Sequence, residues 1–137
     1  MPSRKTQISI LVIGDIIAIA LVTGFGFATH GTLGSAGLRL LTTFIPLLIA
    51  WFAVAPFLGA YDPQHTLKPS QLWRPFWAMV VAAPLAAWLR GAWLNAPILP
   101  VFVLVLGGFS CLGILAWRAV YTLIFSRRLA APRVSNG

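Results

Sequence analysis

The stretch QISILVIGDIIAIALVTGFGFA, residues 7–28, decides the fold class of the chain, because it is almost wholly apolar and has one charged side chain, Asp15. A helix needs about 20 such residues to cross about 30 Å of hydrocarbon. Backbone amides cannot stay unpaired in lipid, so a segment of this kind has to be helical. The stretch therefore predicts a transmembrane helix.

Three further stretches are similarly long and apolar: residues 38–59, 73–94 and 100–125. The segments between them contain glycine, proline and asparagine, which form turns and end helices. Because these connections are short, consecutive helices are expected to be antiparallel neighbours. We therefore predict an all-α fold, in which residues 1–137 form one membrane domain, an antiparallel bundle of four transmembrane helices.

The composition also indicates a membrane protein. Hydrophobic residues make up 59% of the chain and charged residues 9%, whereas soluble domains have about 25% charged residues. The net charge is +8, which in a soluble protein would suggest a nucleic acid partner. Here the basic residues stand beside apolar stretches, so we expect anionic lipid head groups as their partners and no nucleic acid.

The basic residues also predict the orientation of the bundle. Two of the connections, around residues 29–37 and 95–99, contain no Lys or Arg. The positive-inside rule then places both termini and the middle connection in the cytoplasm of a prokaryotic cell, with the chain as a multi-pass inner-membrane protein. We do not expect residues 7–28 to be a cleaved signal peptide, since the stretch is too long and Asp15 interrupts it. The basic residues near the cytoplasmic ends are Arg4, Lys5, Lys68, Arg74, Arg127, Arg128 and Arg133.

Asp15 and Arg118 are the two charged residues expected deepest in the membrane. Asp15 lies about eight residues into the first helix and Arg118 about seven residues before the end of the fourth, so at 1.5 Å per residue both lie roughly 10 Å below the same interface. Opposite charges at equal depth lower the cost of burial in lipid by pairing. We predict an intramembrane ion pair that fixes the docking of two helices. The alternatives are a proton or ion relay through Asp15, and an Arg118 that snorkels to the interface.

A second polar group lies toward the other interface and comprises His30, Arg39, Thr42, Thr43 and Arg90. Two arginines at similar depth repel unless an anion lies between them, so a lipid phosphate, a small anion or a partner's carboxylate would satisfy both. The alternative is that each arginine reaches the head groups separately. A lone histidine is poor support for a metal site, and we expect no metal and no cofactor.

The sequence lacks the parts of an enzyme, because it has no H-E-x-x-H, Walker or G-x-S-x-G motif and only two carboxylates. We expect a non-catalytic accessory or structural component that self-associates or joins a larger membrane complex. The alternative is a small oligomeric transporter or channel for an anion or a proton, and binding of a pigment or a quinone is a third reading. Two ridges of small residues are expected to face outward, where they would let a partner helix approach closely: Ala20, Gly24 and Ala28, and Ala83, Ala87 and Gly91.

Several short motifs, spread over nearly the whole chain, together resemble a family of prokaryotic four-helix membrane proteins, the domain of unknown function numbered three-zero-five-four. The resemblance implies four membrane helices and no particular activity. Members of this family often have a Gly-Arg pair just before the Ser-His-Gly motif. This chain has Phe25-Gly26-Phe27-Ala28 in that region. Any role that the family's arginine plays there therefore cannot be carried over to this chain. The matching motifs are Gly14-Asp15, Thr29-His30-Gly31 in place of Ser-His-Gly, Pro46, Leu89-Arg90, Phe102-Val103-Leu104-Val105, and Ala116-Trp117-Arg118 in place of Gly-Trp-Arg.

Overall fold

The computed structural model describes residues 3–29, 37–66 and 68–130, and the regular structure in these ranges is helical throughout. Four helices are long and apolar enough to cross a membrane, with mean hydropathies between 1.3 and 2.4 in their most apolar windows. The fold is therefore all-α, with four candidate membrane spans. These helices are α1 (Arg4–Thr29), α2 (Gly37–Val54), α4 (Trp73–Leu94) and α5 (Pro100–Ala130).

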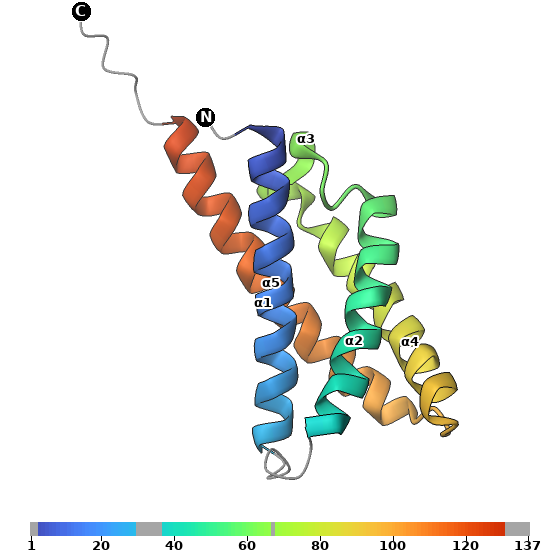
Figure 1. Ribbon diagram of the computed structural model, residues 1–137. Coiled ribbons are helices and arrows are strands. Elements are labelled where there is room, and N and C mark those ends of the chain that lie inside the picture. The colour runs from blue at the N-terminus through green and yellow to red at the C-terminus, as the bar shows by residue number, and fades with distance from the viewer. Residues whose placement is uncertain (1–2, 30–36, 67, 131–137) are drawn as a thin grey trace, which may run out of the picture.

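The four long helices pack in a ring. Helix α1 contacts α2 and α5, and α4 contacts the same two helices from the other side. The start of α1 and the end of α5 lie at one end of the bundle, together with the segment 59–72 that joins α2 to α4 (Figure 1, top). We call this the connector end. Helix α5 is tilted and crosses α1 near the middle of both helices (Figure 1).

Three short helical pieces separate α2 from α4. The 3-10 turn η1 (Ala55–Leu58) follows α2 directly, whereas α3 (Pro63–Thr66) and η2 (Pro69–Gln71) lie within residues 59–72, which we call the connector. The sequence predicts a continuous helix to residue 59, but the α-helix ends at Val54. Pro56 has no backbone N–H to continue the α-helical pattern, so the chain tightens into the 3-10 turn η1. Gly59 then stops it with φ of 72°, a conformation that glycine adopts without strain.

The interior of the bundle is built from smaller apolar residues and a few large ones, whereas the outer surface carries large aliphatic and aromatic side chains. Ala50, Ala78 and Ala82 are fully buried beside Leu47 and Trp51. This distribution suits a protein whose surroundings are as apolar as its core, because tight packing then drives helix association. Exposed side chains on the long helices include Ile13, Leu21, Phe25, Leu104 and Leu112.

Glycines set how closely α5 approaches its neighbours. A Cβ atom on Gly14 of α1 would lie 2.0 Å from the Trp117 ring, and one on Gly113 of α5 would lie 2.5 Å from Val22 Cγ2. An added methyl group would therefore have to displace the Trp117 ring at position 14 or the Val22 side chain at position 113, so the two glycines let the helices cross at this separation.

The structure corrects the interpretation of one small-residue ridge. Ala83 and Ala87 were expected to form an outward surface of their helix, but both are buried inside the bundle. A Cβ atom on Gly107 of α5 would lie 2.9 Å from Ala83 Cβ, so this ridge receives α5. On α1, by contrast, Ala20 is exposed and Gly24 has no atom within 4 Å of an added Cβ. The side chain of Ala28 lies outside the described residues.

Gly14→Ala is expected to destabilise the bundle by about 1–3 kcal/mol, because the added methyl group overlaps the Trp117 ring and the helices have to separate. The matched control is Gly24→Ala on the same helix, where the space is open and the change should stay within about 0.5 kcal/mol. Thermal unfolding in a mild detergent measures both variants. Equal losses for the two would contradict the close approach of α1 and α5.

Candidate functional site

Asp15 of α1 and Arg118 of α5 form a buried ion pair. Arg118 Nη2 lies 2.7 Å from Asp15 Oδ2 and Nε lies 3.0 Å from Oδ1, so the guanidinium donates to both carboxylate oxygens. The two residues are 0% and 3% exposed. The two side chains that were expected at equal depth are thus brought together, and Arg118 does not turn out to the surface.

Two aromatic residues complete the arrangement. Trp51 Nε1, from α2, lies 3.2 Å from Asp15 Oδ2 and 2.9 Å from the Tyr61 hydroxyl oxygen. Tyr61, from the connector, donates its hydroxyl proton to Asp15 Oδ2. The sequence pattern linked neither Trp51 nor Tyr61 to the ion pair.

The connector is also held through its backbone. Arg118 Nη1 donates to the Ala60 carbonyl oxygen at 2.6 Å, and the guanidinium carbon lies 4.9 Å from the centroid of the Tyr61 ring. We call Asp15, Trp51, Ala60, Tyr61 and Arg118 the ion-pair node. It joins α1, α2, the connector and α5 at one point of the bundle.

The hydrogen bonds of the node compensate for the burial of its charges. Each nitrogen of the Arg118 guanidinium has an acceptor, and the Asp15 carboxylate accepts from three different side chains. Burial, and after it the negative charge of Asp15, raise the pKa of Tyr61 above the ordinary tyrosine value. The Tyr61 hydroxyl is therefore held in its protonated form, which is the form that donates to Asp15. This geometry favours the structural interpretation of the pair over a relay.

The residues predicted to hold an anion near the opposite end are placed only in part. His30 and the side chain of Arg39 lie outside the described residues. Thr42 and Thr43 of α2 are buried. Arg90 of α4 is half-buried, with its guanidinium carbon 4.9 Å from the centroid of the Phe102 ring of α5, a cation–π contact between two helices. A shared anion site at this end stays a prediction.

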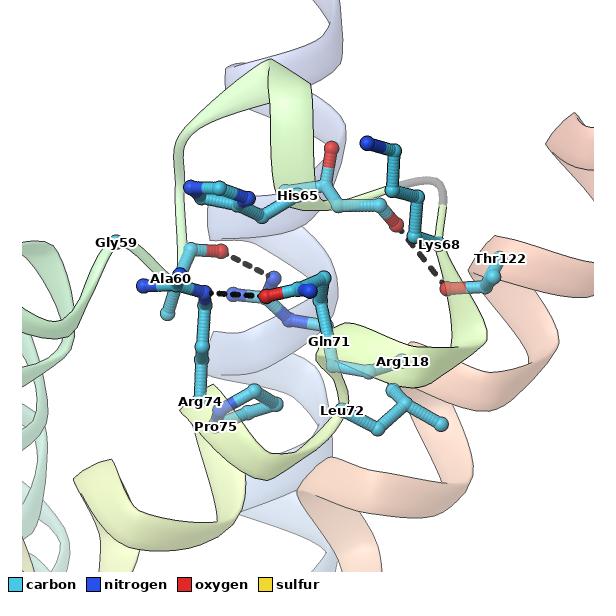
Figure 2. A pocket seen from close by; sticks show the side chains of 11 residues that line it. Gly59, Ala60, His65, Lys68, Gln71, Leu72, Arg74, Pro75, Arg118 and Thr122 are labelled. Atoms are coloured by element: carbon cyan, nitrogen blue, oxygen red, sulfur yellow. Dashed lines mark hydrogen bonds between the residues drawn. The ribbon is translucent and has the colours of Figure 1, made fainter.

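A small pocket opens beside the node at the connector end (Figure 2). Its enclosed volume is about 10 Å³, which is roughly the space of one water molecule. Thr122 of α5 closes one side by donating to the Thr66 carbonyl oxygen at 3.1 Å, and Arg118 reaches the pocket from the node. The remaining lining comes from the connector and the start of α4: Gly59, Ala60, His65, Lys68, Gln71, Leu72, Arg74 and Pro75.

Aromatic side chains at the connector end differ in exposure. Trp73, Phe76 and Trp77 at the start of α4 are exposed, as residues at a lipid–water boundary are. Tyr121 of α5 is buried, with its ring centroid 4.6 Å from that of Phe125. Among the residues in the described ranges, no group of three or more His, Cys, Asp or Glu side chains could hold a metal ion.

Removing one partner of the ion pair is expected to cost far more than removing an exposed charge. Asp15→Ala and Arg118→Ala should each destabilise the bundle by about 3–5 kcal/mol, because each leaves a buried charge without its partner. The double variant should lose clearly less than the two single losses added together. Denaturant or thermal unfolding in detergent measures this coupling.

The matched control for that cycle is Asp62→Asn, which removes the chain's other carboxylate. The Asp62 side chain is 45% exposed and lies 3.9 Å from His65 Nε2, so its loss should cost at most about 1 kcal/mol. Additive losses for Asp15 and Arg118, or a loss at Asp62 of equal size, would contradict the structural role of the node.

One of three comparisons with known proteins gives a match. A family model described as "Protein of unknown function (DUF3054)" matches residues 12–121, which include the Asp15–Arg118 pair, the whole of α2 and α4, and most of α1 and α5. No curated protein and no solved structure was found to match the chain. Since the family model covers most of the sequence, this chain is a member of the DUF3054 family.

Proposed function

We propose that this chain is a small multi-pass protein of a prokaryotic inner membrane with a non-catalytic role, and that it associates with itself or with a larger membrane complex. The observation that carries the proposal is the ion-pair node. Asp15 and Arg118, which would be the natural groups for chemistry in the membrane, are both engaged in holding α1, α2, the connector and α5 together. Their arrangement suits a scaffold.

The proposed bundle is antiparallel, with both ends of the chain and the connector in the cytoplasm. In the described ranges, Arg4, Lys5, Lys68, Arg74 and Arg127 belong to segments at the connector end (Figure 1). An excess of Lys and Arg is the usual mark of the cytoplasmic side. The positions of these residues support the proposed orientation.

The outer face of α1 is the surface we propose for association. Ala20 is exposed, and an added Cβ atom on Gly24 would meet open space. Next to this face runs an apolar groove between α1 and α5, lined in part by Gly14, Ala18 and Gly113. Small residues on an outer helix face let a second helix come close enough for its backbone to make contacts.

Photo-crosslinking from position 24 tests the proposed association. In a Cys111→Ala background, which has no other cysteine, a photoactivatable reagent on Gly24→Cys should capture a second copy or another membrane protein in native membranes. The matched control is Val81→Cys on the exposed side of α4, which should capture lipid alone.

Two results would contradict the proposal. One is that cross-linking from positions 24 and 81 captures no protein, in native membranes or in mild detergent, so that the chain is found only as a monomer. The other is ion flux in proteoliposomes that wild type supports and Arg118→Lys abolishes while the variant keeps its fold, because this result would favour the transporter alternative.

A further inference from the structure

The connector end carries basic side chains that form no ion pair among residues 3–29, 37–66 and 68–130. The whole sequence has only two acidic side chains. Asp15 is bound to Arg118, and Asp62 lies 3.9 Å from His65. Lys68 and Arg74 are the basic residues concerned, and an anion from another molecule can supply their counter-charge.

Arg74 is held in a fixed position by its neighbours. Its Nη1 donates to the Leu58 carbonyl oxygen at 2.8 Å and its Nε donates to Gln71 Oε1 at 2.8 Å. The guanidinium carbon lies 4.5 Å from the centroid of the Trp73 ring. Gly59 makes this position accessible, because a Cβ atom there would lie 2.9 Å from Arg74 Nη1.

These contacts use Nε and Nη1 of Arg74 and fix the plane of its guanidinium group. The third nitrogen, Nη2, has no acceptor among the described residues. A planar, pre-oriented guanidinium loses little conformational freedom when it binds a phosphate oxygen. Arg74 is therefore prepared to bind an oxyanion.

Two further cationic or titratable side chains share the pocket with Arg74. His65 and Lys68 line the pocket together with Arg74. In Figure 2, His65 and Arg74 lie beside Ala60, and Lys68 lies on the opposite side of the pocket, above Thr122. The enclosed space of about 10 Å³ admits roughly one oxygen-sized group. The rest of an oxyanion would stay at the open mouth of the pocket, where the exposed Lys68 can reach it.

The aromatic residues around the pocket indicate which oxyanion is available. Trp73, Phe76 and Trp77 are exposed at the start of α4, and Phe57 of η1 is 90% exposed. Exposed tryptophans of a membrane protein lie at the level of the lipid head groups. Arg74 and Lys68 are thus at the depth of lipid phosphates, where juxtamembrane cations attract anionic lipids.

We infer that the connector end carries a binding site for the phosphate of an anionic phospholipid, formed by Arg74 and Lys68 with His65 beside them. This inference rests on the proposal that the four helices span a membrane. It narrows the general expectation that basic residues meet anionic lipid head groups to one pocket and to two named side chains.

Binding of phosphatidylglycerol to protein in a mild detergent, followed by native mass spectrometry, tests the site. Lys68→Gln and Arg74→Gln should each weaken the apparent Kd about fivefold. Lys68 is exposed and its connector hydrogen bonds use backbone atoms, which Lys68→Gln retains, so this variant remains informative if Arg74→Gln disturbs the connector. The matched control, Arg127→Gln, removes the same charge from an exposed position on α5 and should change binding by less than about twofold.

Equal affinities of wild type, Lys68→Gln and Arg74→Gln would overturn the site, as would an equal loss in Arg127→Gln. Displacement of phosphatidylglycerol by an equal concentration of inorganic phosphate would overturn the lipid as its ligand, since a free ion would then suffice.

Reconstitution into neutral phosphatidylcholine nanodiscs separates this inference from the proposed function. A chain that fails to enter them contradicts both, whereas a chain that enters them and shows no preference for phosphatidylglycerol contradicts the site alone.

Discussion

The structure depends on the pairing of Asp15 with Arg118 in surroundings that cannot solvate either charge. An unpaired charge near the centre of a helix in lipid costs at least about 2.5–3.5 kcal/mol, and the bidentate contact at 2.7 and 3.0 Å compensates for this cost only because further hydrogen bonds complete it. Trp51 and Tyr61 supply donors to the carboxylate, and the Ala60 carbonyl accepts from the guanidinium. Satisfying the ion pair between α1 and α5 thus requires two further segments, α2 and the connector, to be in place.

The packing of the helices and the chemistry of the node depend on each other. Gly14 stands next to Asp15, and Trp117 stands next to Arg118. The contact of Gly14 with the Trp117 ring sets the separation of α1 and α5 at the level where the two charged side chains have to meet. The connector end follows from this arrangement, because Arg118 fixes Ala60 and also lines the pocket in which Arg74 and Lys68 lie.

Much of the architecture could be predicted from the sequence, because hydrocarbon imposes simple rules. A minimum length of apolar residues defines the spans, and the equal depth of Asp15 and Arg118 suggests their pairing. The donors around the pair were harder to predict. A buried tryptophan needs an acceptor for its N–H, and this requirement could have linked Trp51 to Asp15, but Tyr61 lies in an irregular segment whose path no periodicity describes. The prediction that the ridge at Ala83 and Ala87 faces outward was also wrong. The spacing of small residues shows that they share one face of a helix, but it does not show whether another helix covers that face.

The most direct test of this account is disulfide formation between α1 and α5. An ideal Cβ atom on Gly113 lies 3.9 Å from Val22 Cβ, close to the mean of about 3.8 Å in disulfides. In a Cys111→Ala background, Val22→Cys with Gly113→Cys should cross-link rapidly in native membranes under mild oxidation. The same pair should cross-link much more slowly once Arg118→Ala removes the ion pair. Failure to cross-link with Arg118 present, or an unchanged rate without it, would contradict the claim that this ion pair holds the bundle together.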